Sequence, residues 1–466
     1  MTNWQAGRNN GPKRLGDAAA GDPANAGAGD PANAGSARAT PGRYNEDMEQ
    51  LIARIHQMLI EELDSDQIAA LPADERRGVV EGAAETLVKR ELPNVGGITR
   101  DQIVARVVDE VVGLGPIDAL LRDPSISEVM VNAPDEVFFE REGIVYLSDV
   151  RFRDLTHIMR VIERVVAPIG RRVDESSPMV DARLPDGSRV NVVIPPVAPK
   201  SPTITIRKFR ADKLSMDDLV AATTLTPDMA EFLKACVKLK LNIIVSGGTG
   251  TGKTTFLNAM SEYIPEGERI LTIEDPMEIK IRQPHVISLE ARPANIDGKG
   301  EITQRDLLRN TLRMRPDRII IGEVRGPEAF DMLNAMNTGH EGSLSTIHAN
   351  SPRDALSRIE NMVLMASLEL PSRAIREQTA SAIDVFIQLV RFTDGVRRVT
   401  KVTECTGMEG EVITLQDLFE FRQDHIDGEG KIHGQIRPTG IRPSFAERFD
   451  AAGINLPEGL FLARSA

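Results

Sequence analysis

The sequence contains little cysteine and no long apolar run. Its two cysteines among 466 residues, Cys236 and Cys405, are too few for a disulfide framework or a four-thiolate zinc module. No stretch approaches the roughly 20 consecutive apolar residues of a membrane-spanning helix, and the N-terminus lacks the apolar core of a secretory signal. We therefore expect a protein of the reducing cytoplasm that does not cross a bilayer.

The chain also carries too little positive charge for an extended contact with nucleic acid. Its formal net charge is -13 at pH 7, which opposes a large continuous phosphate-binding surface and makes nucleic acid a disfavoured partner. Hydrophobic residues make up 41% and charged residues 27% of the sequence, as is typical of globular proteins. The length allows roughly three domains.

The composition changes along the first half of the chain. Residues 1–43 are rich in Ala, Gly, Pro and Asn and contain GDPANAG twice, which predicts a disordered tail acting as a spacer, tether or localisation signal. Residues 44–115 carry apolar residues at helical spacing and predict a small helical bundle. One of its helices is expected over 73–91, and another from a capping box at 99–102. Residues 116–212 alternate strand-like runs with turns and predict an α+β domain.

Residues 213–466 predict a parallel sheet with crossover helices, because strand-like and helix-like segments alternate. The expected strands contain LNIIVS, RILTIE, VISLEA, RIIIGE and SLSTIH, and the expected helices start at Lys253, Thr303, Pro327 and Ser351. A hairpin that turns at Asp394-Gly395 would extend this sheet with an antiparallel strand. The predicted fold class is α/β.

A glycine-rich loop carries the strongest chemical signal. GGTGTGKT, residues 247–254, matches G-x-x-x-x-G-K-[ST] and lies between an apolar strand and a helix, as a P-loop does. Gly248, Gly250 and Gly252 let backbone N–H groups converge on phosphate oxygens. Lys253 reaches the β and γ phosphates, and Thr254 ligates Mg²⁺. The expected nucleotide-binding residues are Gly248, Thr249, Gly250, Thr251, Gly252, Lys253, Thr254 and Thr255.

Acidic residues follow two other predicted strands. Gly322 stands where many P-loop proteins have an aspartate, so Glu323 is the only acid directly after the run RIII, and we expect it at the metal. A solvated strand end is the alternative. TIEDPMEI places Glu274, Asp275 and Glu278 at the end of another strand. An acidic turn would explain them structurally, whereas a catalytic site would use Glu278 to orient the attacking water.

Two histidines belong to a third segment, TGHEGSLSTIHAN. A histidine at a strand end beside phosphate can donate a hydrogen bond to the γ-phosphate oxygens. Isolated histidines are more often ordinary core or surface residues. His340 and His348 lie in one strand and turn unit, which makes a functional role as reasonable as a structural one.

Four motifs in this order resemble those of the type II/type IV secretion ATPase superfamily. GGTGTGKTT, TIEDPMEI, RIIIGEVRG and TGHEGSLSTIHANSPRDALSRIENM are similar to its Walker A motif, Asp box, atypical Walker B motif and His box. The likeness covers roughly residues 116–421. STIHAN and AIREQTASAIDVFIQL look most like the CpaF-type ATPases of tight-adherence (Tad/Flp) pili, with VirB11-type ATPases next. The resemblance implies a RecA-like ATPase domain that binds ATP and Mg²⁺.

The resemblance also implies roles for individual residues. Lys253 and Thr254 would bind the phosphates and Mg²⁺, and Glu323 would hold the metal site. Glu278 would activate water, and His348 would sense the γ-phosphate with support from His340. Because only two cysteines are present, the tetracysteine zinc module of many pilus-assembly and type II secretion ATPases is excluded.

A homo-hexamer is implied as well, in which arginines of the domain before the P-loop reach the phosphates. Arg183 and Arg189 flank the predicted turn at 185–188, and Arg207 lies on the next strand-like run, so all three could reach one ligand. A solvated basic edge is the alternative explanation.

These observations predict a hexameric Mg²⁺-dependent ATPase that turns hydrolysis into domain motion. It would work in the cytoplasm against inner-membrane platform proteins and power the assembly of a Tad/Flp-type type IV pilus, with retraction as a further option. A VirB11-like type IV secretion ATPase is the alternative. A nucleic-acid translocase is a more distant one, and a monomeric nucleotide switch or small-molecule kinase would need no arginine in trans.

Overall fold

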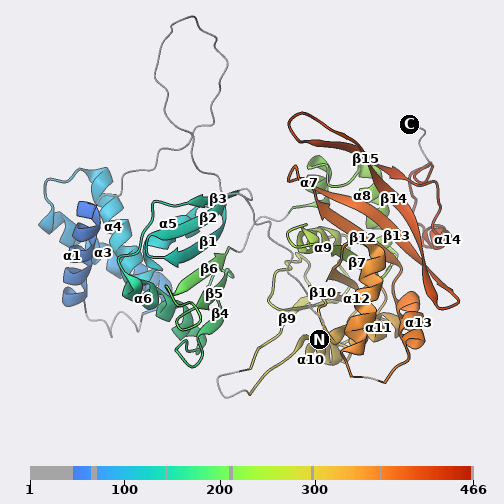
Figure 1. The fold of residues 1–466 in the computed structure, drawn as a ribbon, viewed down its shortest axis with the longest axis horizontal. Helices are drawn as coiled ribbons and strands as arrows, with labels where there is room; N and C mark the ends of the chain where they lie inside the picture. Colours follow the sequence, from blue (N-terminus) through green and yellow to red (C-terminus); the bar gives the residue numbers. More distant parts are fainter. Residues whose placement is uncertain are drawn as a thin grey trace, which may run out of the picture. The chain divides into compact units, whose positions relative to one another are not determined.

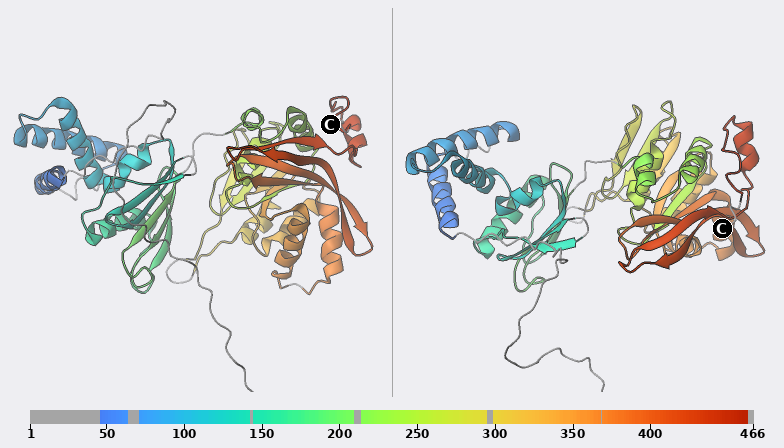
Figure 2. Two further views of the ribbon diagram at one scale, coloured as in Figure 1. Left: turned by 45° about the horizontal axis from the view of Figure 1, so that its top comes forward. Right: turned by 90° about the horizontal axis from the view of Figure 1, so that it is seen from above.

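The computed structural model describes residues 46–63, 71–141, 144–208, 214–294, 299–367 and 369–462. The predicted tail, residues 1–43, lies outside these ranges. The described residues form helices and two sheets (Figures 1 and 2). None of the helices in the described ranges is long and apolar enough to cross a membrane.

The first three helices of the described residues pack together: α1 (Glu46–Glu62), α3 (Ala73–Glu91) and α4 (Gly97–Val112). Their apolar stripes form one core that includes Ile55, Leu59, Leu87 and Val107. Side chains three or four positions apart share a helix face, so this core is the one that the apolar spacing predicted. The helix expected over 73–91 is confirmed.

The predicted start of α4 is wrong. The helix begins at Gly97, its N-cap is Gly96 in an extended conformation, and no side chain caps it. Thr99 therefore lies inside the first turn, where its backbone is helical and it cannot serve as the N-cap. The capping-box pattern matched by chance because glycine, which needs no side-chain cap, already starts the helix two residues earlier.

The first sheet is antiparallel, with strand order β3-β2-β1-β6-β5-β4. Its strands are β1 (Ile126–Ala133), β2 (Glu136–Arg141), β3 (Ile144–Leu147), β4 (Met179–Arg183), β5 (Arg189–Val193) and β6 (Thr203–Arg207). The same part of the chain contains three short helices, η1 (Gly115–Ile117), α5 (Asp118–Arg122) and η2 (Ala167–Ile169). Helix α6 (Leu155–Val166) packs against the sheet and contributes Ile158, Val161 and Ile162 to their common core.

The turn between β4 and β5 forms as predicted. Asp186 Oδ1 accepts a hydrogen bond from the Ser188 N–H at 2.9 Å, and Gly187 has φ of 90°, which glycine adopts without steric cost. The turn brings the end of β4 directly beside the start of β5.

The second sheet has the order β15-β14-β13-β12-β7-β11-β10-β8-β9. Strands β12, β7, β11, β10, β8 and β9 are parallel to one another, and β13, β14 and β15 continue the sheet antiparallel. Their bounds are β7 (Ile243–Gly247), β8 (Ile270–Glu274), β9 (Val286–Glu290), β10 (Arg318–Ile321), β11 (Leu344–His348), β12 (Val385–Arg391), β13 (Arg397–Glu409), β14 (Val412–Ile426) and β15 (Ile432–Pro438). The predicted α/β class is confirmed.

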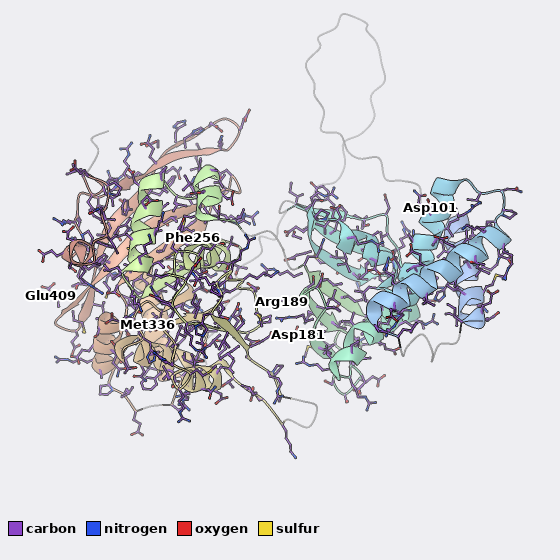
Figure 3. The ribbon with its side chains drawn as sticks, turned by 180° about the vertical axis from the view of Figure 1, so that it is seen from behind. Asp101, Asp181, Arg189, Phe256, Met336 and Glu409 are labelled. Carbon is purple, nitrogen blue, oxygen red and sulfur yellow. The ribbon has the colours of Figure 1, made fainter. Side chains whose placement is uncertain are left out.

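Helices cover both faces of this sheet, so its central strands are apolar on both sides. One face packs against α7 (Met216–Ala221), α8 (Pro227–Lys238) and α9 (Lys253–Ser261), with α14 (Ala446–Ala451) in the same core. The other packs against α10 (Gln304–Thr311), α11 (Glu328–Asn337), α12 (Pro352–Leu364) and α13 (Ser372–Ala382), of which the last three lie side by side in Figure 1. Phe256 of α9 and Met336 of α11, labelled in Figure 3, belong to these two cores.

Candidate functional site

The P-loop connects β7 to α9. Gly250 and Gly252 have φ of 71° and 91°, values that favour glycine. A Cβ on Gly247 would lie 2.6 Å from the carbonyl oxygen of Leu389, so this position also excludes a side chain. The loop conformation therefore depends on the glycines that its sequence supplies.

Lys253 lies at the first turn of α9 and is 7% exposed. Its Nζ donates a hydrogen bond to the carbonyl oxygen of Gly248 at 3.1 Å. Thr251 Oγ1 donates to the same oxygen at 2.9 Å. The Lys253 side chain thus folds back, and its ammonium group contacts the loop that precedes α9.

A histidine and a glutamate complete a cluster around Lys253. His348 ends β11, and its Nε2 lies 3.2 Å from Lys253 Nζ and 2.9 Å from Glu323 Oε1. Arg325 donates from Nη2 to Glu323 Oε2 at 2.7 Å. The carboxyl ends of β7, β10 and β11 therefore meet at one place, as expected for a parallel sheet.

The charges in this cluster affect one another. Burial lowers the pKa of Lys253, and the negative charge of Glu323 opposes that shift. Burial and the nearby Lys253 charge lower the pKa of His348, so its imidazole is neutral at pH 7. Burial raises the pKa of Glu323, but the hydrogen bond from Arg325 and the surrounding positive charges outweigh it and lower the pKa below its usual value. Glu323 is an anion beside a cationic lysine.

The three acids of the Asp box differ in burial. Glu274 is 2% exposed, and its Oε2 accepts hydrogen bonds from the N–H groups of Glu278 at 2.6 Å and Ile279 at 2.8 Å. Asp275 is exposed, and Glu278 is half-buried. Glu274 therefore supports the backbone of the segment that carries Glu278.

Glu274 also explains the missing aspartate at position 322. A Cβ on Gly322 would lie 2.9 Å from Glu274 Cγ, closer than real side chains approach. The space that an aspartate would need is filled by Glu274 from the neighbouring strand β8. Burial raises the pKa of Glu274 to about 7, and its Oε1 is buried without a hydrogen-bond partner among the described residues.

The three candidate arginines share one row of the first sheet. Arg183 lies opposite Arg189 across β4 and β5, and Arg189 lies opposite Arg207 across β5 and β6. Residues directly opposite in an antiparallel sheet point to the same face. The register therefore brings the three guanidinium groups onto one surface, and their predicted contact with a shared ligand stays a prediction.

Each of these arginines pairs with a carboxylate. Nη2 of Arg189, a residue labelled in Figure 3, lies 2.6 Å from Glu278 Oε1. Arg183 Nη1 lies 2.8 Å from Glu290 Oε2, and Arg207 Nε lies 3.7 Å from Glu128 Oε1. Arg189 and the Asp-box carboxylate Glu278, both candidate site residues, thus contact each other directly.

His340 does not join this cluster. It precedes β11, and its N–H donates to the carbonyl oxygen of Ala335 at 3.3 Å. His348 is at the other end of that strand, and at about 3.3 Å per residue the two histidines are well over 10 Å apart. The structure does not bring His340 to the P-loop of the same chain.

Sequence reasoning missed two site neighbours. Arg325 bonds Glu323, and Arg397 donates from Nε to the carbonyl oxygen of Gly250 at 2.9 Å. Arg325 follows Glu323 by two positions, so proximity in sequence was an available signal. Arg397 is remote in sequence and carries no motif, so only the pairing of β12 with β7 brings it to the loop.

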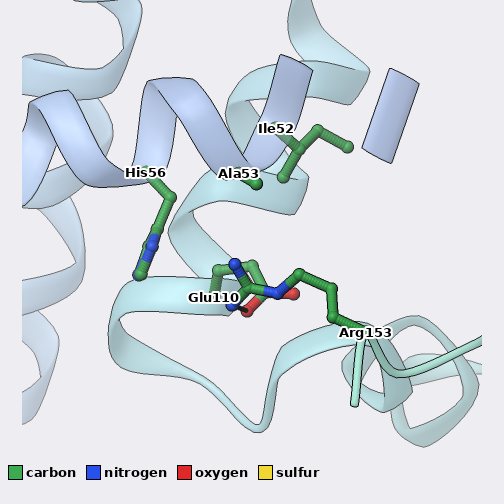
Figure 4. Close-up of a pocket in the computed structure, with 5 residues that line it drawn as sticks. All are labelled: Ile52, Ala53, His56, Glu110 and Arg153. Carbon is green, nitrogen blue, oxygen red and sulfur yellow. Dashed lines mark ion pairs between the residues drawn. The ribbon is translucent and has the colours of Figure 1, made fainter. Parts of the chain in front are cut away.

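A separate small pocket is lined by Ile52, Ala53, His56 and Glu110 of the helical bundle and by Arg153, which precedes α6 (Figure 4). Glu110 Oε2 lies 2.9 Å from His157 Nε2 and 3.8 Å from Arg153 Nη2. His157 Nδ1 accepts a hydrogen bond from the Arg153 N–H, so the Nε2–H on the other side of the ring can donate to Glu110. We interpret this group as a structural link between α4 and α6.

The fold and this lysine-bearing loop define a protein of the P-loop class. Within that class, the chain belongs to the type II/IV secretion system protein family, whose model matches residues 110–422.

Three similar proteins illustrate the relationship. A "Putative conjugal transfer protein" of Mycobacterium tuberculosis is 38% identical over 309 residues, covering 65% of this chain and 87% of that protein. The type IV secretion system protein VirB11 of Bartonella henselae is 32% identical over 346 residues, covering 65% of this chain and 94% of that protein. The crystallised VirB11 ATPase of Brucella suis in complex with sulphate is 30% identical and covers 62% of this chain and 94% of its own, with a TM-score of 0.35.

Proposed function

We propose that the chain is an ATPase that hydrolyses ATP to ADP and phosphate with Mg²⁺. The observation that carries this proposal is the cluster of Lys253, His348 and Glu323, in which a buried lysine on the P-loop lies 3.2 Å from an imidazole that lies 2.9 Å from a carboxylate. A cation, a neutral hydrogen-bond donor and an anion at one sheet edge are the groups that a triphosphate and its metal require.

Mg²⁺ fits the oxygen groups available at this edge. Mg²⁺ prefers oxygen ligands and is typically held by one or two protein groups together with phosphates and waters. Thr254, in the first turn of α9, and Glu323, after β10, would provide a hydroxyl and a carboxylate. The metal would neutralise charge on the phosphates, while the residues of this chain orient the nucleotide.

Glu278 is our candidate for orienting the attacking water. It lies in the segment held by Glu274, and its carboxylate contacts Arg189 at 2.6 Å. A triphosphate carries more negative charge than one carboxylate and competes for the same guanidinium. Nucleotide binding would draw Arg189 toward the phosphates and free Glu278 to accept a proton from water.

This exchange would convert hydrolysis into motion. Arg183, Arg189 and Arg207 belong to the first sheet, whereas the P-loop belongs to the second. Attraction of the arginine row to bound phosphate would hold the two sheets together, and loss of the γ-phosphate would weaken that attraction. We propose that six copies form a closed ring, in which such changes pass from one protomer to the next.

The proposed cellular task is to drive assembly of a Tad/Flp-type type IV pilus from the cytoplasmic face of the inner membrane, through platform proteins. The sequences STIHAN and AIREQTASAIDVFIQL, which resemble those of CpaF-type ATPases, support this branch. A VirB11-like role in type IV secretion is the second candidate, and the names of the conjugal transfer and VirB11 relatives favour it.

Two variants test the proposal. Lys253→Ala and Glu278→Ala should each lower ATP turnover by more than about 100-fold while circular dichroism stays unchanged, and cells carrying either variant should lack surface pili. Glu409→Ala, at the exposed end of β13, is the control. Normal pili in the Glu278→Ala strain would overturn the pilus assignment, and loss of conjugal or effector transfer in that strain would favour the VirB11-like role.

A further inference from the structure

A hairpin of the second sheet places two arginines against the P-loop. Arg391 ends β12, Arg397 begins β13, and the two lie opposite each other in the register. Arg397 Nε donates to the carbonyl oxygen of Gly250 at 2.9 Å. Arg397 Cδ lies 3.4 Å from the position of a Cβ on Gly252, and Arg391 Nη1 lies 3.9 Å from that of a Cβ on Gly250.

The strand order shows which end of a nucleotide these arginines would meet. Strand β7 lies between β11 on one side and β12 on the other. The β11 side carries His348 and, one strand further, Glu323, which mark the γ-phosphate end of the site. A nucleotide that lies across the loop must extend its ribose and base toward the other side, where β12 ends.

The chemistry of the guanidinium group suits that end. Its planar face stacks on aromatic rings, and this contact does not use its N–H groups. The hydrogen bond to Gly250 restrains the plane of Arg397, so less freedom is lost when a ring stacks on it. Both arginines are exposed. Their neighbour Arg398 is excluded because it is 7% exposed, pairs with Asp394 and packs over Phe392.

We propose that Arg397, with Arg391 beside it, binds the adenine and ribose end of the nucleotide. This inference rests on the proposed function, namely that the loop binds ATP. It adds two residues from the β12–β13 hairpin to a site otherwise built from the P-loop and from β10 and β11.

Calorimetric titration of the full-length protein with two ligands tests the inference. The ligands are β,γ-imido ATP and inorganic tripolyphosphate, each with Mg²⁺, because the second has phosphates but no base or ribose. Arg397→Ala should weaken binding of β,γ-imido ATP by about 5- to 30-fold and leave tripolyphosphate binding within about twofold. Arg391→Ala should show the same selectivity with a smaller loss.

Arg422→Ala, which removes an exposed arginine of β14, is the control and should bind both ligands as the wild type does. Equal weakening of both ligands by Arg397→Ala would mean that Arg397 only supports the loop, and unchanged binding of β,γ-imido ATP would mean that it does not contact the nucleotide. Either result overturns the inference. A wild-type protein that binds neither ligand would instead overturn the proposed function.

Discussion

The two sheets assemble their candidate functional groups in different ways. In the second sheet, most of the phosphate site comes from one continuous loop at the carboxyl end of β7, and its neighbours β10 and β11 add Glu323 and His348. In the first sheet, Arg183, Arg189 and Arg207 come from separate strands and meet only because the antiparallel register aligns them. The first kind of site can be recognised from a motif, and the second needs the strand pairing.

The two sites also differ in how their charge is balanced. Around the P-loop, the neutral His348 contacts both the buried Lys253, at 3.2 Å, and the anionic Glu323, at 2.9 Å. In the arginine row each cation pairs with a different carboxylate, at distances from 2.6 to 3.7 Å. Lys253 is held by a hydrogen bond to its own loop. In the arginine row, by contrast, a bound phosphate can replace the carboxylate that each arginine contacts.

Removal of the carboxylate at the P-loop side should have the largest effect. Glu323→Gln should lower ATP turnover by at least about 100-fold, because the amide cannot supply negative charge to a metal. Circular dichroism and the thermal midpoint should stay close to those of the wild type. Glu360→Gln, which alters a carboxylate that pairs with Arg376, is the matched control. Turnover within threefold of the wild type would remove Glu323 from the site.

The buried Glu274 should make the stability of the second sheet depend on pH. Its pKa is raised from 4.5 to about 7, so between these values the folded state keeps a proton that the unfolded chain has lost. The stability from this protonated carboxyl is full below about pH 4.5 and is lost as the pH rises to about 7. Relative to the wild type, Glu274→Gln should therefore gain about 2–3 kcal/mol in free energy of unfolding from pH 5 to pH 8.

Urea unfolding followed by circular dichroism at several pH values measures this gain. Glu409→Gln should show no such trend, because that side chain is exposed. A pH-independent difference between Glu274→Gln and the wild type would contradict the buried, protonated carboxyl.

Within the arginine row, the middle position should matter most. Arg189→Ala should lower kcat/KM for ATP by about 10- to 30-fold, because Arg189 contacts Glu278, whereas Arg183→Ala should stay within about threefold, because Arg183 pairs with Glu290. Steady-state kinetics on both variants makes the comparison. Equal losses would show that the row acts only through its total charge.

The elements that could be predicted are those whose structure is determined by a few neighbouring residues. The strands around the P-loop, the helix from Lys253, the turn at 185–188 and the hairpin at Asp394-Gly395 all follow from short sequence signals and are confirmed. The predicted start of α4 was wrong because the helix begins at the glycine pair 96–97, before Thr99. Strands β14 and β15 were not predicted.

The candidate site was predictable to the same extent. The motifs identified Lys253, Glu323 and His348 as neighbours of one ligand, and these residues do lie together. No local pattern distinguishes Glu274 from Asp275, because their burial depends on the sheet pleat and on the space left by Gly322. Arg397 could not be predicted for the same reason, since it meets Gly250 only through the pairing of β13 with β12 and of β12 with β7.

ATP turnover per chain, measured over a dilution series with particle mass determined on the same samples, tests whether hydrolysis needs the ring. The proposed mechanism requires that the P-loop and the arginine row work within a closed ring. It predicts that turnover per chain falls together with the fraction of chains in six-membered particles, and that Lys253→Ala is inactive at every concentration. Undiminished turnover in samples that contain only single chains would contradict it.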